Sequence, residues 1–150
     1  MRVTLQRVTE ASVVISDILH ADIQQGLVVF LGITNEDSTE DIEWLCRKIC
    51  ALRIFNDASG KMNNSLLDVK GEVLVISQFT LYASTKNGNR PSYIKAAKPD
   101  IAIPLYNLFI ASIGALVSGT VRTGEFGADM KISLINDGPV TIHLDSKVKE

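Results

Sequence analysis

The run Asn136-Asp137-Gly138-Pro139-Val140-Thr141 constrains the fold of this chain more than any other segment. It places a Gly-Pro bond between two strand-like stretches, Met130–Asn136 and Val140–Leu144. Because proline donates no backbone N–H and cannot continue a central ladder, the bond predicts a break between two strands. An X-Pro bond can also become cis at a cost of roughly 0.5–1 kcal/mol, although most are trans. A cis bond here would aim neighbouring backbone carbonyls in nearly one direction.

The 150 residues are expected to form one domain over 1–150, with the composition of an ordinary globular protein. Residues rich in Val, Ile and Thr predict two long strands over Arg2–Ser16 and Ile23–Ile33, separated by a polar turn at Asp17–Asp22. A capping signal at Ser38–Asp41 predicts that a helix begins there. Segments dominated by strands, with helices in two blocks, indicate an α+β fold with a barrel-like, mostly antiparallel sheet and two main helices.

A further strand is predicted over Glu72–Leu81, apolar on both faces at its start and therefore central and buried. Alternation along a strand would send Ser77 and Phe79 to one face and Gln78 and Thr80 to the other.

The second helix is expected to carry Pro99 or Pro104 only in its first turn and to end at Gly119. Its spacing predicts an apolar stripe that faces the core, made of Leu105, Leu108, Phe109, Ile113 and Leu116.

Charge is distributed unevenly along the chain. A net charge of −2 and a pI near 5.7 argue against a general nucleic-acid binder, DNA included. From Val73 to Pro99 there is no Asp or Glu, and this stretch contains Lys86, Arg90, Lys95 and Lys98. Such a local basic patch suits a partner that touches one face, such as one end of an RNA, and is equally consistent with a solvated loop.

Several features bear on location and on metal or cofactor chemistry. The amino terminus has no apolar signal-peptide region, and the uncharged stretch Ile101–Val121 is too interrupted for a membrane span, so a cytoplasmic protein with a buried or interfacial helix is expected. Cys46 and Cys50 share a helical face as core residues. His20 and His143 lack a metal-binding context, so neither a metal nor a cofactor is predicted.

A nucleophilic Ser77 or Thr80 would need an adjacent base. The stretch Val73–Pro99 contains no His, Asp or Glu, so a catalytic triad has no support within it. Any base would have to come from elsewhere in the fold, with His20 and His143 as the outside candidates.

Short motifs along the chain occur together in one order: Gln6-Arg7-Val8, Arg53-Ile54-Phe55, Gly60-Lys61-Met62-Asn63, Ser77-Gln78-Phe79-Thr80-Leu81, Arg90-Pro91-Ser92, Phe126-Gly127-Ala128-Asp129-Met130, and Asn136–Thr141. With this order and spacing the chain resembles the D-aminoacyl-tRNA deacylases over essentially its whole length. The resemblance implies hydrolysis of the ester that joins a D-amino acid to the terminal ribose of tRNA, without a metal.

The resemblance assigns catalysis to Ser77, Gln78, Phe79 and Thr80. Backbone N–H groups there would hold the ester and stabilise the oxyanion, and the neighbouring 2′-hydroxyl of the terminal adenosine would assist. Phe79 would form a wall of the pocket or stack on the terminal base. Thr80 as a covalent nucleophile is the less favoured alternative. A related branch acts on mischarged L-aminoacyl-tRNA and replaces the serine and phenylalanine of this motif, so Ser77 and Phe79 favour the D-specific branch.

The resemblance also implies how the site distinguishes D-aminoacyl from L-aminoacyl esters. The backbone carbonyls of a cis Gly138-Pro139, inserted into the partner's site in a homodimer, would exclude an L-substituent. Arg7 matches the residue that holds this loop, and Phe126 and Met130 look like pocket wall. Glycine has no side chain to exclude, so glycyl-tRNA, such as that mischarged on tRNA-Ala, should also be hydrolysed.

Two other functions remain open on the sequence. One is a non-catalytic RNA-binding module that uses Lys86–Lys98. The other is a hydrolase that cleaves a different small ester through Thr80.

Overall fold

The sheet is organised around the pairing of the first and last strands of the chain. In the computed structural model, which describes residues 1–149, β1 (Arg2–Ile15) lies antiparallel to β8 (Met130–Asp145). On its other edge β1 pairs antiparallel with β2 (Ile18–Ile23) and β3 (Gly26–Gly32). The sheet then continues in parallel from β3 to β6 (Glu72–Ser77) and β7 (Val121–Thr123).

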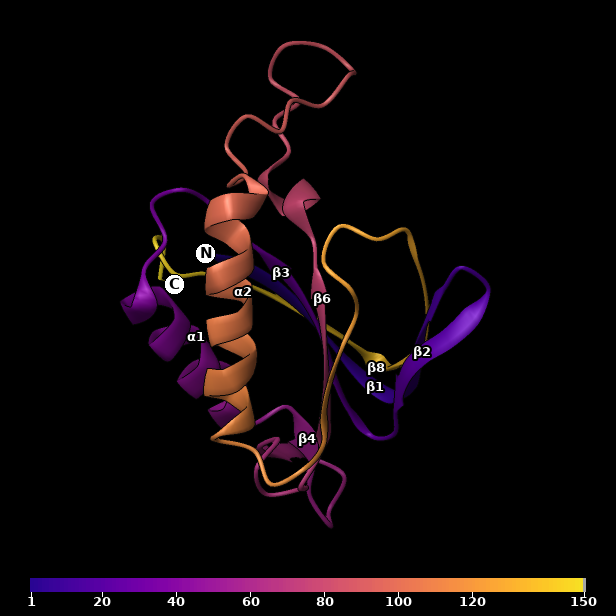
Figure 1. Ribbon diagram of the computed structural model, residues 1–150. Coiled ribbons are helices and arrows are strands. Elements are labelled where there is room, and N and C mark those ends of the chain that lie inside the picture. Colours follow the sequence, from indigo (N-terminus) through magenta and orange to yellow (C-terminus); the bar gives the residue numbers. More distant parts are fainter. Residues whose placement is uncertain (150) are drawn as a thin grey trace.

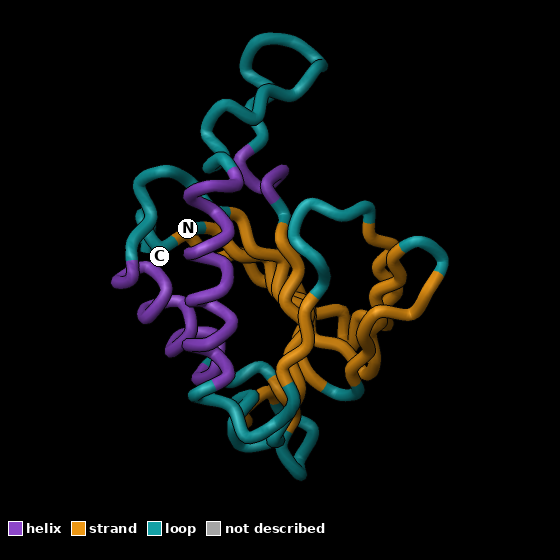
Figure 2. Tube along the Cα trace, in the orientation of Figure 1, coloured by secondary structure: helices purple, strands orange, loops and turns teal. Residues whose placement is uncertain are grey.

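Two helices, α1 (Thr39–Ala51) and α2 (Pro99–Gly114), lie side by side against one face of this curled sheet (Figures 1 and 2). The expected α+β class, with two main helices and a barrel-like, mostly antiparallel sheet, is confirmed. The main core fills the space between helices and sheet, and its largest members include Leu5, Leu31, Leu45, Phe55 and Phe109.

A second, smaller core lies where the sheet curls on itself. It contains Val8, Val13, Ile23, Val28, Leu74 and Ile76, contributed by β1, β2, β3 and β6 and covered by β8. Both faces of β6 are therefore buried, which confirms the prediction of a central strand.

The capping signal of α1 is confirmed, since the backbone N–H of Ser38 donates to the Asp41 carboxylate at 2.8 Å. The predicted polar turn at Asp17–Asp22 was wrong. The turn is confined to Ser16 and Asp17, whose φ angles of 50° and 63° suit a tight hairpin, and β2 follows at once. β2 lies at the edge of the sheet and is largely exposed, so it lacks the apolar alternation of a buried strand.

The second helix differs from the prediction in three respects. Pro99 occupies its first turn, but Pro104 lies inside it on the exposed face. The helix ends at Gly114, before Gly119. The side chains that it buries are those of Ala102, Tyr106, Phe109 and Ile113, whereas Leu108 and Leu116 of the predicted stripe are exposed.

Two short strands, β4 (Phe55–Asn56) and β5 (Met62–Asn64), form a separate small hairpin. Among residues 1–149, no helix has both the length and the apolar character needed to cross a membrane. The structure also contains a single turn of 3-10 helix, η1 (Phe79–Tyr82), which follows β6.

Candidate active site

The site begins where β6 ends. The predicted strand over Glu72–Leu81 was wrong beyond Ser77, because Gln78 adopts φ −141° and ψ 77° and the chain enters η1. The last ladder bond is donated by the Gln78 N–H to the Leu31 carbonyl at 2.8 Å. The predicted alternation is therefore lost, and Ser77, Gln78 and Phe79 line one cavity together. Thr80 lines a different cavity.

η1 is packed tightly against β3. A Cβ atom added at Gly32 would lie 3.0 Å from the Leu81 Cβ and 3.1 Å from the Gln78 carbonyl oxygen, so a larger residue would push the turn away by a few tenths of an ångström. Tyr82, the last residue of η1, is buried. Burial is the main reason that the pKa of its hydroxyl is raised. The Arg2 guanidinium lies 4.7 Å from the centre of the Tyr82 ring and donates to the Leu81 carbonyl at 3.1 Å. These contacts fix the turn that carries the site residues.

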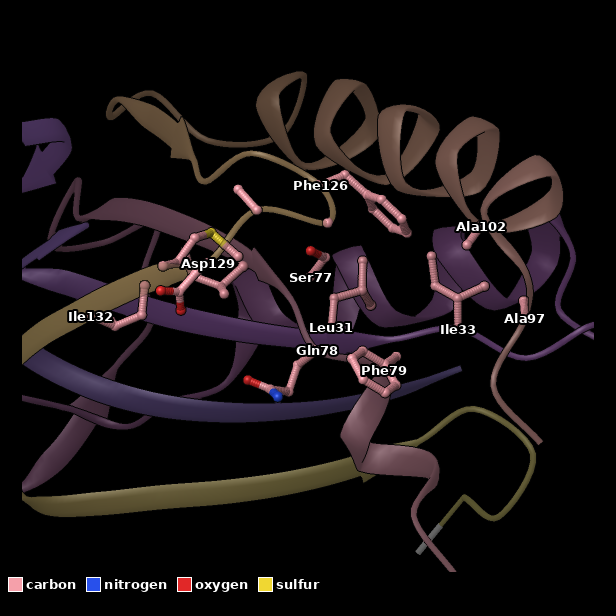
Figure 3. A pocket seen from close by; sticks show the side chains of 14 residues that line it. Leu31, Ile33, Ser77, Gln78, Phe79, Ala97, Ala102, Phe126, Asp129 and Ile132 are labelled. Carbon is pink, nitrogen blue, oxygen red and sulfur yellow. The ribbon is translucent and has the colours of Figure 1, made fainter. Parts of the chain in front are cut away.

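The cavity beside this turn has a volume of about 300 Å³. Figure 3 shows Phe126 on one side of it, beneath α2, with Gln78 and Phe79 on the opposite side. Its lining combines the turn, the end of β3, the start of α2 and the segment that leads into β8: Leu31, Ile33, Ile76, Ser77, Gln78, Phe79, Ala97, Ala102, Phe126, Gly127, Ala128, Asp129, Met130 and Ile132. Five of the nine predicted site residues are thus brought together: Ser77, Gln78, Phe79, Phe126 and Met130.

The polar groups of the turn are mostly donors. The Gln78 side-chain amide donates to the Thr80 hydroxyl. Within residues 1–149 the backbone N–H groups of Phe79 and Thr80 have no protein acceptor, as is usual for the first turn of a helix. Free N–H groups beside a cavity can bind a carbonyl oxygen and stabilise it as negative charge develops.

No histidine lines this cavity. His143 lies at the cavity that Thr80 lines, and its Nδ1 is 2.8 Å from the Thr4 hydroxyl. Asp129 supplies the one carboxylate among the lining residues, and it forms an ion pair with Lys131 at 2.7 Å. Within the described part of the chain, no three His, Cys, Asp or Glu side chains come together as a metal site.

Gly138 and Pro139 lie in a bulge of β8. Along β1 the paired residues advance from Gln6 to Val8, while along β8 they go from Thr141 to Asn136, so residues 137–140 stand out from the ladder. The prediction of two separate strands was therefore wrong. Asn136 and Thr141 are joined by a side-chain hydrogen bond of 3.0 Å across the base of the bulge, and β8 continues on both sides. The Gly138–Pro139 peptide bond is cis.

Arg7 lies beneath the bulge and is only 5% exposed. It donates to the Asp137 carbonyl at 3.1 Å and to the Ile54 carbonyl at 2.6 Å, and it pairs with the Asp137 carboxylate at 3.1 Å. A Cβ atom at Gly138 would come within 2.9 Å of the Arg7 Nη2. Arg7 thus packs directly against the bulge and joins it to the β4 segment.

Gly138 and Pro139 are exposed and are not among the residues that line the cavity of their own chain. The predicted site residues therefore form two groups, the cavity with its turn and the bulge with Arg7.

Comparison with known proteins decides the family. A family model described as D-Tyr-tRNA(Tyr) deacylase matches residues 4–145. A D-aminoacyl-tRNA deacylase of Bacteroides fragilis is 59% identical over 150 residues, which is 100% of both chains. One from Cytophaga hutchinsonii is also 59% identical, again over 100% of both chains. The chain belongs to the D-aminoacyl-tRNA deacylase family. As a deacylase of this family, it is a hydrolase that cleaves the ester bond of D-aminoacyl-tRNA.

Solved structures show the same architecture. A protein described as c-Myc DNA Unwinding Element Binding Protein superposes on the deacylase with a TM-score of 0.92 at 39% identity, over 97% of this chain and 98% of the other. A probable eukaryotic D-amino acid tRNA deacylase gives a TM-score of 0.80 at 17% identity, over 95% and 97% of the two chains, and this likeness shows the fold alone.

Sequence reasoning missed several residues that line the deacylase cavity. Asp129 lies inside a motif that carried the resemblance and could have been included on that ground. Leu31 follows from the pairing of β3 with β6, and Ile33 from its backbone hydrogen bond with Ala97, and the sequence revealed neither contact. Ala97 and Ala102 carry no chemical signal at all, because they contribute only small side chains to the wall.

Proposed function

We propose that the deacylase binds the D-aminoacyl ester in the cavity beside η1 and cleaves it without a side-chain base. The observation that carries this proposal is the start of η1, where the backbone N–H groups of Phe79 and Thr80 have no protein acceptor and Phe79 lines a cavity without histidine. An aminoacyl ester is already activated, and the 2′-hydroxyl of the terminal adenosine lies next to it. The protein then has to position the ester and to stabilise the oxyanion.

Each residue of the turn has a role in this proposal. The N–H groups of Phe79 and Thr80 bind the developing oxyanion, and the Gln78 amide holds the ribose or ester. Ser77 and Phe126, on two sides of the cavity, confine the aminoacyl group together with Met130.

The bulge is proposed to complete the site of a second copy in a homodimer. Gly138 and Pro139 are exposed and do not line their own cavity, and Arg7 supports them from beneath. Backbone carbonyls of this loop would occupy the space of an L-substituent and leave that of a D-substituent free. The same exclusion cannot act on glycine, so glycyl-tRNA formed on tRNA-Ala would be a second substrate. We also propose that the reaction takes place in the cytoplasm, because its substrate is a tRNA.

The test compares D-Tyr-tRNA with L-Tyr-tRNA in one deacylation assay, with and without a chelator. We expect free D-tyrosine to be released, L-Tyr-tRNA to stay intact, and the chelator to have no effect. Equal rates on the two enantiomers would contradict the proposed exclusion, and loss of activity with the chelator would contradict a mechanism without metal. Binding of tRNA without ester cleavage would instead support the non-catalytic RNA-binding module.

A further inference from the structure

The segment between η1 and α2, residues 83–98, is the most prominent protrusion of the molecule (Figure 1). We call it the projection. Its two arms are joined by a pair of backbone hydrogen bonds between Ser84 and Ser92, at 2.8 and 2.9 Å. Its returning arm is attached to the end of β3, because the Thr34 hydroxyl donates to the Lys95 carbonyl at 2.7 Å. Ala97, at the base of this arm, lines the catalytic cavity, so projection and cavity share a wall.

The projection contains a cavity of its own, with a volume of about 300 Å³. It is lined by Ser84, Asn87, Arg90, Ser92, Ile94 and Lys95. The lining thus offers two cations, two hydroxyls and an amide, the groups that usually contact phosphate and sugar oxygens. No acidic residue lies between Val73 and Pro99 to oppose these cations. None of the cations of the projection is in an ion pair within residues 1–149.

Two aromatic rings lie at the junction of the projection and the catalytic turn. Phe79 and Tyr93 pack edge to face, with ring centroids 5.0 Å apart. The two residues are nevertheless 57% and 38% exposed, so ring surface remains free. Ile94, at 89%, adds an apolar surface beside them. Cationic groups combined with exposed rings are the usual means of binding single-stranded nucleic acid.

We propose that the unpaired 3′ segment of the tRNA leaves the catalytic cavity across Phe79 and Tyr93 and enters the cavity of the projection. The bases next to the terminal adenosine stack on the rings, and their phosphates contact Arg90 and Lys95. This inference rests on the proposed function, because it starts from an ester bound beside η1. It adds a subsite for the nucleotides that precede the esterified one, and therefore a way to recognise tRNA without reading the amino acid.

The first test uses the double variant Arg90→Gln, Lys95→Gln on two substrates, D-Tyr-tRNA and the small ester 3′-O-D-tyrosyl-adenosine. With D-Tyr-tRNA we expect KM to rise about tenfold. The dependence of log kcat/KM on log salt should become shallower by about 0.7 for each phosphate that the protein no longer neutralises. With the adenosine ester, which has no preceding phosphate, kcat and KM should not change. Arg47→Gln is the matched control, since Arg47 is exposed on α1 outside the projection.

The second test addresses the rings. Tyr93→Leu should raise KM for D-Tyr-tRNA about tenfold, the typical loss for one stacked base, with no change for the adenosine ester. Tyr93→Phe keeps the ring and should behave as the unmodified protein does.

Two results would overturn the subsite. One is an unchanged KM and salt slope for D-Tyr-tRNA in the double variant, as expected if the projection contacts a protein. The other is an equal loss on both substrates, which would mean that the variants damage the catalytic turn itself. Failure of the unmodified protein to cleave either D-ester would refute the proposed function instead. Binding of uncharged tRNA by the double variant then decides the subsite, since it should be weaker and less sensitive to salt.

Discussion

Thr80 has a different role in each of two possible mechanisms: it attacks the ester as a nucleophile, or it only orients Gln78. A hydroxyl becomes a nucleophile only when a neighbouring base can take its proton. The side-chain amide of Gln78 donates to the Thr80 hydroxyl, and an amide nitrogen cannot serve as that base. His143 lines the same cavity as Thr80, and neither residue lines the cavity of Ser77, Gln78 and Phe79. Thr80 is therefore better placed to orient Gln78 than to attack an ester.

Thr80→Val should lower kcat on D-Tyr-tRNA by about tenfold, the value of one hydrogen bond, because the Gln78 amide loses its acceptor. His143→Ala should leave kcat unchanged. If Thr80 were the nucleophile, the loss would be on the order of a million-fold, as when a catalytic serine is removed. Single-turnover deacylation kinetics of both variants measure the difference.

Arg7 is a buried cation whose interactions all go to other segments of the chain. Arg7→Ala would leave the Ile54 carbonyl and the Asp137 carbonyl without their donor. We expect the free energy of unfolding to fall by about 2–4 kcal/mol. Urea denaturation measures this change. Arg122→Ala is the control, since Arg122 is exposed on β7 and its removal should cost less than about 0.5 kcal/mol. Equal effects of the two substitutions would contradict a supporting role for Arg7.

At the scale of the elements, the sequence predicted the features that depend on residues close together in the chain. It did not predict those that depend on contacts between distant segments. α1 could be placed because its capping residues lie within four positions of one another. η1 could not, because the chain turns after Ser77 against Gly32 of a neighbouring strand, which leaves room for it. β8 is a second example. Pro139 predicted that the strand would end, but the pairing of β8 with β1 resumes beyond the bulge.

The first turn of α1 should make stability depend on pH. Burial opposes ionisation of Asp41, but hydrogen bonds from Lys147, Ser146 and Ser38 outweigh it, so that its pKa is held well below the usual value of 3.8. A carboxylate with a lowered pKa stabilises the fold fully above the unfolded pKa, and this effect declines as pH falls from the unfolded pKa through the lower folded pKa.

Asp41→Asn should therefore lower the free energy of unfolding at pH 7 by about 1–2 kcal/mol and by clearly less at pH 2, where the pH approaches the lowered pKa of Asp41. The measurement is urea denaturation at both pH values. Glu40→Gln, at an exposed neighbouring position, is the control and should have almost no effect at either pH. A loss of equal size at pH 7 and pH 2 would show that ionisation of Asp41 does not stabilise the helix.

On the scale of the whole molecule, the sequence led to the family more readily than to the topology. Motifs spread from Gln6 to Thr141 carried the resemblance, although none of them says which strands are neighbours. The parallel pairing of β3 with β6, which places Leu31 beside Ser77, depends on contacts across the whole chain. It is this pairing that leaves the cavity on one side of the molecule and the exposed bulge of β8 apart from it. One copy therefore holds both parts of the proposed site but does not bring them together.

If the bulge acts in a second copy, two different lesions should complement each other. Gln78→Ala damages the cavity, and Pro139→Trp places a bulky side chain on the exposed loop that has to enter the partner's cavity of about 300 Å³. Each variant alone should be inactive on D-Tyr-tRNA. Co-expressed under two affinity tags and purified as the mixed dimer, they should recover about half of the unmodified activity, because one cavity then meets one intact loop. A mixed dimer as inactive as its parents, or a protein that is monomeric and fully active, would mean that each chain completes its own site.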